Sequence, residues 1–285
     1  MENINVIFIG GLTNGKIVFD YLNTNKFVNL SLVITYPNDS DKPRHINFPD
    51  ENYIIKDENA NNYIETILKL KPNLIIVAGW SELLDNKILS SPNMGVIGFH
   101  PSKLPSDRGR SVIAWQIEDG YTETALTMFY YNDIPDGGEI IGQSLITIED
   151  NDYVNDILDK VDKATTNLIK AYFPLIRLGK APKMPQSINE GNFRRLRTEE
   201  DSFIFWNSNM DIIYNKIRAI SYPYPGAITY VNDRKIKIFE AKKIKDFPFG
   251  NELKTGQTVC KLYDGSFILR CKDGFINITK YSNYE

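Results

Sequence analysis

The sequence is poor in cysteine and histidine, with two of each among its 285 residues. Cys260 and Cys271 do not have the spacing of a metal-binding or redox motif. They have the option of pairing with each other, but two isolated cysteines in a chain with no export signal favour the reduced form. The sequence therefore predicts no metal centre and no disulfide framework.

Long apolar runs are also missing. No run approaches the 18 residues that would indicate a membrane-spanning helix. The amino-terminal stretch MENINVIFIGG lacks the basic start and the cleavage site of a signal peptide. We therefore expect a cytoplasmic protein with no membrane partner.

Positive charge is not in excess. The chain has 33 Lys and Arg against 36 Asp and Glu, a net charge of -3 and a pI of about 5.6. Proteins that bind the phosphate backbone of nucleic acids usually carry a marked excess of Lys and Arg. From residue 200 onward acidic and basic residues are mixed, and we expect no basic stripe there. The charge argues against nucleic acid as a main partner.

The first 150 residues alternate apolar, strand-like runs with stretches of helical periodicity. This alternation predicts βαβ units in an α/β fold, an open, doubly wound, mostly parallel, Rossmann-like sheet. Ligands of such sheets bind beyond the carboxyl ends of the strands, and His100 follows one of them. The expected strands are 4–11, 30–35, 72–80 and 94–100, and the expected helices are 16–22 and 63–71.

The stretch GGLTNG at 10–15 lies where a nucleotide fingerprint would follow the first strand. It lacks the G-x-G-x-x-G order, and no P-loop Gly-Lys-Ser/Thr occurs in the chain. A plain strand-to-helix turn is the better interpretation.

The character of the chain changes after a long amphipathic helix at 156–181 and a polar stretch at 186–202. A helix at 209–220 and several short strands predict a small β-rich domain, such as an open barrel. We expect a catalytic domain at 1–185, a linker at 186–208 and a β-rich domain at 209–285. The expected strands are 227–231, 235–244, 258–263, 266–271 and 275–279.

His100 and Asp136 are the strongest candidates for acid–base chemistry. Taken singly, a histidine at a strand end is more often structural, and an aspartate in a Pro-Asp-Gly-Gly turn is usually there for the turn. If residues 125–131 form a further strand of the same sheet, its end and the end bearing His100 can lie side by side. A carboxylate beside an imidazole fixes its tautomer and stabilises its protonated form, which suits proton transfer near neutrality.

Arg108 and Arg110 flank Gly109 where a helix is expected to begin. Arginines at a helix start favour phosphate oxygens. A solvated helix end with its ion pairs is the alternative.

These residues together carry a family resemblance. The order H-P-S-x-L-P-x-x-R-G, then a tryptophan, then an aspartate in a D-x-G turn resembles the 10-formyltetrahydrofolate-dependent formyltransferases. That family includes methionyl-tRNA formyltransferase and the formyltransferases of nucleotide-linked amino sugars. A later stretch with I-R-A and P-Y-P-G-A, within 194–231, resembles the family's entry into its C-terminal β domain, so the resemblance covers about residues 4–240. The motif residues are His100, Pro101, Ser102, Leu104, Pro105, Arg108, Gly109, Trp115 and Asp136.

The resemblance implies a mechanism in which an amine attacks the formyl carbon of N10-formyltetrahydrofolate. His100 would be the general base, and Asp136 would orient it and help the proton reach the leaving nitrogen. Residues 74–84 and 134–136 would wall the pterin pocket, mostly through backbone groups. The implied folate-binding residues are Ala78, Gly79, Trp80, Ser81, Leu83, Ile134 and Pro135.

One departure from the family pattern concerns the oxyanion. The family has Asn-x-His, with the asparagine amide as donor, and this chain has Gly98-Phe99-His100. Losing one oxyanion donor costs on the order of 10² to 10³ in rate. A backbone N–H, a bound water or protonated His100 are alternative donors. The departure leaves either a variant enzyme or one that has lost catalysis.

For the acceptor, the resemblance and the acidic charge favour a dideoxy sugar with an amine at C3 or C4, linked to dTDP or UDP, as in lipopolysaccharide O-antigen biosynthesis. Cations would hold the pyrophosphate and an aromatic platform the base. The tyrosines of SYPYPG could equally pack the domain interface. The alternatives are a methionyl-tRNA formyltransferase and a non-catalytic folate- or nucleotide-binding relative, and a homodimer could form through a β edge. The predicted acceptor-binding residues are Ser102, Lys103, Arg108, Arg110, Arg194, Arg195, Tyr222 and Tyr224, with Arg197 nearby.

Overall fold

The computed structural model describes residues 3–187, 189–231 and 233–284 and divides into two compact units. The first unit consists of residues 1–109, 124–146 and 159–193. The second consists of residues 110–123, 147–158 and 194–285. The units are therefore interleaved along the chain, and two segments that precede residue 185 are part of the second unit.

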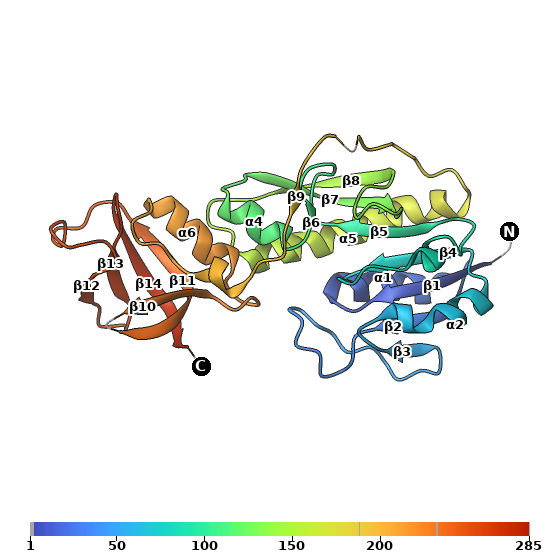
Figure 1. Cartoon of the computed structure of the whole chain (residues 1–285), viewed down its shortest axis with the longest axis horizontal. Coiled ribbons are helices and arrows are strands. Elements are labelled where there is room, and N and C mark those ends of the chain that lie inside the picture. The colour runs from blue at the N-terminus through green and yellow to red at the C-terminus, as the bar shows by residue number, and fades with distance from the viewer. Residues whose placement is uncertain (1–2, 188, 232, 285) are drawn as a thin grey trace. The chain divides into compact units, whose positions relative to one another are not determined.

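A seven-stranded sheet forms the centre of the first unit, in the order β3-β2-β1-β4-β5-β7-β8 (Figure 1). Neighbouring strands from β3 to β5 are parallel, and β7 is antiparallel to β5. This architecture confirms the expected mostly parallel, doubly wound sheet. The strands are β1 (Ile4–Gly10), β2 (Val28–Thr35), β3 (Ile54–Lys56), β4 (Leu74–Ala78), β5 (Val96–His100), β7 (Glu123–Tyr130) and β8 (Ile140–Thr147).

The central strands are mostly apolar because helices cover both faces of such a sheet. Every residue of β4 is buried, and so are the last five residues of β1. The associated helices are α1 (Thr13–Asn23), η1 (Ala60–Tyr63), α2 (Ile64–Leu70), α3 (Asn86–Leu89) and α5 (Val154–Arg177), and β6 (Arg108–Gly109) and β9 (Phe193–Arg194) are short additional strands.

The glycines at 10–15 serve the close packing of the turn between β1 and α1. A Cβ at Gly10 would lie 1.9 Å from the carbonyl oxygen of Ala78, and one at Gly15 would lie 2.6 Å from the same atom. These contacts with the end of β4 account for both glycines without a phosphate, in agreement with a plain strand-to-helix turn.

The second unit contains a five-stranded sheet in the order β10-β11-β14-β13-β12, all of whose paired strands are antiparallel. The β-rich domain expected near the end of the chain is therefore present. Its two cysteines, Cys260 and Cys271, are both free thiols. Helix α4 comes from the middle of the chain and packs with α6 in this unit. The elements are α4 (Val112–Glu118), η2 (Glu199–Ser202), α6 (Met210–Ala219), β10 (Ala227–Val231), β11 (Arg234–Ile244), β12 (Thr258–Lys261), β13 (Phe267–Arg270) and β14 (Phe275–Asn283).

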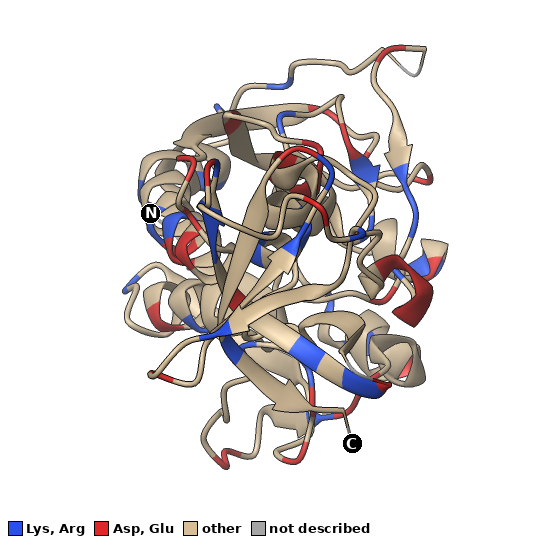
Figure 2. Ribbon diagram, turned by 90° about the vertical axis from the view of Figure 1, so that its left-hand side faces the viewer, with Lys and Arg blue, Asp and Glu red and all other residues tan. Residues whose placement is uncertain are grey.

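Strand β11 is more basic than the composition of the chain indicates. Its only acidic residue is Glu240, and Figure 2 shows basic bands on strands of this unit with acidic residues in the loops around them. The expectation of no basic stripe after residue 200 is therefore wrong for this strand. Its cationic residues are Arg234, Lys235, Lys237, Lys242 and Lys243.

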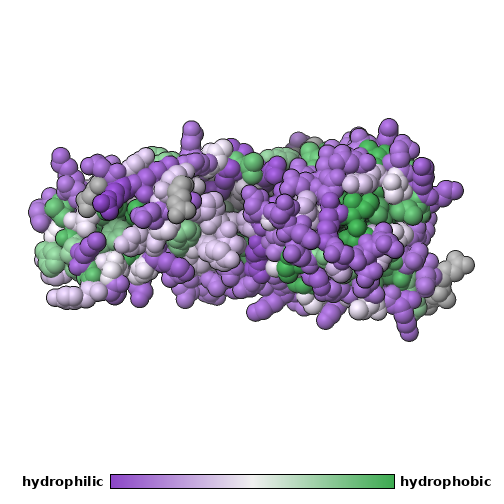
Figure 3. Space-filling model, turned by 90° about the horizontal axis from the view of Figure 1, so that it is seen from below, coloured by the Kyte–Doolittle hydropathy of each residue, from purple (hydrophilic) through white to green (hydrophobic). Residues whose placement is uncertain are grey.

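The face shown in Figure 3 is mostly hydrophilic, and its apolar areas are small and separate. Within the described residues, no helix combines the length and the apolar character needed to span a membrane.

Candidate active site

The antiparallel pairing of β5 with β7 determines how the candidate acid–base pair forms. Ile97 lies opposite Tyr130 and His100 lies opposite Thr127, so the carboxyl ends of the two strands point toward opposite edges of the sheet. The expectation that His100 and Asp136 meet at adjoining strand ends is therefore wrong about the cause. Tyr131 continues the pairing toward the start of β5, with its N–H donating to Val96 O at 2.8 Å, and the loop after it returns to place Asp136 beside His100.

The returning loop brings the Asp136 carboxylate beside the His100 imidazole. Asp136 Oδ1 lies 3.5 Å from His100 Nδ1, and the two side chains are 19% and 8% exposed. The backbone N–H of Gly109 donates to Asp136 Oδ2 at 2.8 Å. The carboxylate is thus held by one oxygen and directs the other at the histidine.

The other ring nitrogen of His100 determines its tautomer. His100 Nε2 lies 2.7 Å from the carbonyl oxygen of Asp107. A carbonyl oxygen only accepts hydrogen bonds, so Nε2 carries a hydrogen, and in the neutral ring Nδ1 is the basic nitrogen. The role predicted for Asp136 therefore needs correction: the Asp107 carbonyl fixes the tautomer, and Asp136 faces the basic nitrogen.

Asp107 is itself held in place by Asn192. The Asp107 N–H donates to Asn192 Oδ1, and Asn192 Nδ2 donates to Asp107 Oδ1, both at 2.8 Å. Asp107 has a left-handed backbone conformation (φ 52°) that this reciprocal pair supports. Sequence reasoning passed over both residues because their contribution is made through a main-chain carbonyl.

The arrangement is suited to accepting a proton. Nδ1 can take a proton from a nucleophile, and the Asp136 carboxylate then stabilises the imidazolium by charge. Enclosure of both groups strengthens this interaction relative to the same pair in water.

The space beside Gly98 is filled by Tyr131. A Cβ at Gly98 would lie 2.1 Å from Tyr131 Cε1 and 2.7 Å from both Cζ and Oη. The ring stacks on Phe129 at a centroid distance of 5.1 Å. The tyrosine that directly follows β7 therefore occupies the place where an asparagine side chain would leave β5.

The predicted folate-binding residues follow β4 and lie on the 131–139 loop. Ala78 is buried, Gly79 has a left-handed conformation (φ 63°), and Trp80 stacks on Tyr36 with ring centroids 4.4 Å apart. The Ser81 N–H donates to the Tyr36 hydroxyl at 2.9 Å, and burial raises the pKa of that hydroxyl. Beyond this braced stretch Leu83 is 73% exposed; on the loop, Ile134 is half-buried and Pro135 is exposed.

Two of the predicted acceptor-binding residues are used inside the fold. The Ser102 hydroxyl is buried and donates to Ser106 O at 2.7 Å. Arg108 is 1% exposed, and its guanidinium donates to Gln186 Oε1, Ser187 O and Glu190 O at 3.0, 3.2 and 3.1 Å. A guanidinium enclosed in this way holds Gln186, Ser187 and Glu190, so the structure corrects the predicted phosphate contact of Arg108.

The other predicted residues differ in their surroundings. Lys103 and Arg110 are exposed, and Arg110 forms no ion pair with any described residue. Tyr222 is 70% exposed, whereas Tyr224 is half-buried. The linker arginines are paired with carboxylates: Arg194 with Asp119 (2.7 Å), Arg195 with Asp201 (2.6 Å) and Arg197 with Glu118 (2.6 Å).

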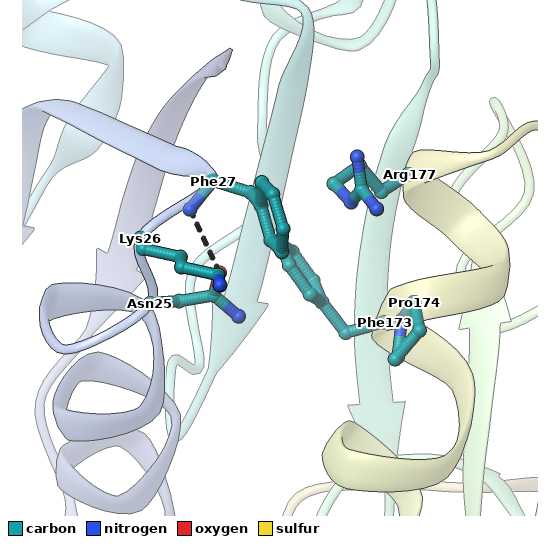
Figure 4. Close-up of a pocket in the computed structure, with 6 residues that line it drawn as sticks. All are labelled: Asn25, Lys26, Phe27, Phe173, Pro174 and Arg177. Carbon is teal, nitrogen blue, oxygen red and sulfur yellow. Dashed lines mark hydrogen bonds between the residues drawn. The ribbon is translucent and has the colours of Figure 1, made fainter. Parts of the chain in front are cut away.

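A separate cavity of about 320 Å³ in the first unit is lined by residues 25–27 of the α1–β2 turn and by the end of α5 (Figure 4). Phe27 O accepts a hydrogen bond from Ile4 N at the start of β1, so this cavity lies at the amino ends of the strands. The Arg177 guanidinium lies 4.2 Å from the centre of the Phe27 ring. The cavity is therefore not part of the site around His100.

Comparisons with known proteins find two matching families. Residues 3–172 match the family described as formyl transferase, and residues 197–283 match the formyl transferase C-terminal domain. A methionyl-tRNA formyltransferase of Staphylococcus aureus is 36% identical over 182 residues, 64% of this chain and 58% of that protein. The matched part is thus less than two thirds of that relative.

Two solved structures share the fold over nearly the whole chain. The N-formyltransferase of Helicobacter canadensis, solved with folinic acid and dTDP-3-aminofucose, has a TM-score of 0.72 and 18% identity, covering 98% of this chain and all of its own. HypX of Aquifex aeolicus, solved with tetrahydrofolic acid, has a TM-score of 0.74 and 16% identity, covering all of this chain and 45% of its own.

Proposed function

Because the chain belongs to the formyl transferase family, we propose that it transfers the formyl group of N10-formyltetrahydrofolate to the amine of a nucleotide-linked amino-dideoxy sugar. The observation that carries the proposal is the enclosed His100–Asp136 pair, with one ring nitrogen set as a base. The reaction has one step that requires such a base, because the acceptor amine must lose a proton.

The proposed reaction proceeds through one tetrahedral intermediate. The neutral amine attacks the formyl carbon, a C–N bond forms, and the formyl oxygen takes the negative charge. His100 Nδ1 removes the extra proton from the attacking nitrogen, with Asp136 stabilising the imidazolium. The proton then passes to N10 as its bond to the formyl carbon breaks and tetrahydrofolate leaves. Acid–base help of this kind is worth on the order of 10² to 10⁴ in rate.

The choice of a nucleotide sugar rests on the length over which this chain matches a sugar N-formyltransferase and on accessible side chains. The Helicobacter canadensis enzyme, whose structure contains dTDP-3-aminofucose, matches this chain over nearly its full length and its own. Within the second unit, exposed Arg110 suits a phosphate group and exposed Tyr222 suits stacking on a base. Either dTDP or UDP and either a 3-amino or a 4-amino sugar fit this description.

Methionyl-tRNA is the second candidate acceptor. The 36% identical Staphylococcus aureus relative and the cationic strand β11 both favour it. Two of the β11 cations are paired, Lys235 with Glu199 (2.9 Å) and Lys243 with Asp211 (2.6 Å), which lowers the charge offered to a phosphate backbone.

The acceptor can be identified by turnover. The protein is incubated with N10-formyltetrahydrofolate and, separately, with methionyl-tRNA and a panel of dTDP- and UDP-linked amino sugars, and formylated product is measured by mass spectrometry. We expect product with at least one sugar. Product with methionyl-tRNA alone would replace the proposal by the second candidate, and folate binding without product would indicate a non-catalytic relative.

The base is tested by His100→Asn. We expect turnover to fall by at least 10³-fold while the affinity for the folate stays within a few fold, because the residues after β4 are untouched. Steady-state kinetics and folate titration measure the two quantities. Turnover close to wild type would remove His100 from the mechanism.

A further inference from the structure

The proposed reaction places a negative charge on the formyl oxygen, and β5 offers no side chain to meet it. Residues 98 and 100 lie on the same face of the strand because side chains alternate along a β-strand. A donor beside His100 would thus come from position 98, where Gly98 has only hydrogen. A side-chain donor other than His100 would have to come from another element.

We propose that the Tyr131 hydroxyl is the oxyanion donor of this enzyme. The inference rests on the proposed formyl transfer. Tyr131 Oη lies 2.7 Å from the position of a Cβ on Gly98. The terminal atoms of an asparagine amide lie about 2.4 Å from its own Cβ, from standard bond lengths. The phenol oxygen therefore lies about as far from the Cβ position of residue 98 as the terminal atoms of an asparagine amide would, on the face of β5 that bears His100.

The ring of Tyr131 is held in place on several sides. It stacks on Phe129 and packs against buried residues of two core clusters. Its backbone N–H donates to Val96 O. A donor fixed in this way stabilises developing charge without having to reorganise during the reaction.

The hydroxyl is also available to a ligand. Within residues 3–187, 189–231 and 233–284, it makes no hydrogen bond to another side chain or main-chain group. Burial raises the pKa of Tyr131, and the charge of Asp136 acts in the same direction. The phenol therefore stays protonated near neutral pH, and its O–H can donate a hydrogen bond.

The chemistry requires no proton transfer from Tyr131. The O–H donates a hydrogen bond to the formyl oxygen as the C–N bond to the amine forms, and the bond weakens again when the carbonyl reforms and N10 leaves. The proton of the amine is taken up by His100 and passes on to N10, so it does not involve Tyr131.

Tyr131→Phe tests the inference because it removes only the hydroxyl. We expect kcat to fall by about 10² to 10³ with the KM values for folate and sugar within a few fold, as for the loss of a donor that acts in the transition state. Tyr130→Phe is the matched control: it removes the neighbouring phenol oxygen and should change kcat less than twofold. A kcat for Tyr131→Phe within threefold of wild type would overturn the inference.

A donor moved to position 98 provides a rescue experiment. Gly98→Asn alone should lower turnover because its side chain displaces the Tyr131 ring. In the Tyr131→Ala background the ring is gone, and adding Gly98→Asn should raise kcat at least tenfold over Tyr131→Ala. If the double variant is no faster, the loss in Tyr131→Ala reflects packing around the ring and the inference fails. Melting temperatures of all variants check that each is folded.

Failure of the inference is distinguishable from failure of the proposed function. A wild-type protein that formylates no acceptor overturns both. An active wild type with an unimpaired Tyr131→Phe variant overturns the role of Tyr131 alone.

Discussion

At the scale of single residues, the partners of an arginine side chain decide whether it is free to bind a phosphate. Residue type alone made Arg108, Arg194 and Arg195 candidates for phosphate binding. Arg108 is buried against main-chain carbonyls, and the other two are paired with Asp119 and Asp201. Glu190 lies 82 positions from Arg108 and Asp119 lies 75 positions from Arg194, so these two pairings emerge only in three dimensions, whereas Asp201 lies 6 positions from Arg195.

The contribution of the Asp201 carboxylate to stability can be tested by its dependence on pH. Arg195 donates to both of its oxygens at 2.7 and 2.6 Å, and the Thr198 N–H donates at 2.7 Å. The pKa of Asp201 is lowered, first by the Arg195 hydrogen bond. A carboxylate whose folded pKa is lowered adds stability above its unfolded pKa of about 3.9 and loses it as the pH falls through the folded value.

Asp201→Asn is therefore expected to lower the melting temperature by about 2–4 °C at pH 7, the effect of about 1 kcal/mol in a chain of this size. The difference from wild type should shrink as the pH falls below about 4. Melting curves of both proteins between pH 2.5 and 7 measure it. A difference that is constant with pH would show that the carboxylate charge does not contribute.

At the scale of elements, the turn between β7 and β8 places both Asp136 and Tyr131. Asp136 has a left-handed conformation (φ 55°), and a Cβ at Gly138 would lie 1.7 Å from Tyr130 O. A contact that short with a main-chain oxygen allows only glycine. The Pro-Asp-Gly-Gly sequence thus forms a tight turn and also places the Asp136 carboxylate beside His100.

Gly138→Ala should therefore shift the turn and lower turnover by about 10²-fold, as expected for a displacement of catalytic groups by roughly 1 Å. Gly265→Ala is the control, since a Cβ there meets nothing within 4 Å. Because Gly265 has a left-handed backbone (φ 86°), we expect Gly265→Ala to cost about 1 kcal/mol of stability and to leave turnover unchanged. Kinetics and melting temperatures of both variants test this, and equal turnover in the two would contradict it.

At the scale of the whole molecule, the two units do not follow the order of the chain. Helix α4 belongs to the second unit, where Glu118 pairs with Arg197 (2.6 Å) and Lys216 (2.8 Å). Tyr153, also from an earlier segment, exchanges hydrogen bonds of 3.1 Å with the backbone of Ala241. The second unit is therefore completed by segments from the middle of the chain.

A chain ending at residue 185 should not fold cooperatively. It lacks α6, so the buried residues Val112, Ile113 and Ile117 of α4 lose part of their cover and Glu118 loses both cations. We expect poor solubility or a broad thermal transition by circular dichroism, with strong binding of a hydrophobic dye. A soluble fragment with a sharp transition like that of the full chain would contradict the prediction.

The sequence by itself determined the parallel sheet and the later β-rich sheet, and it named His100 and Asp136 as the candidate acid–base pair. Buried parallel strands need continuous apolar runs, and such runs are visible without coordinates. The resemblance carried by the motif around His100 also drew attention to Gly98, where the family pattern has an asparagine.

Only the tertiary structure decided what surrounds these residues. The antiparallel register of β7 and the return of its loop bring Asp136 to Nδ1, the Asp107 carbonyl to Nε2 and the Tyr131 ring to Gly98. The physical reason is that local periodicity specifies which residues are buried, whereas strand direction and loop path depend on contacts between residues distant in the chain.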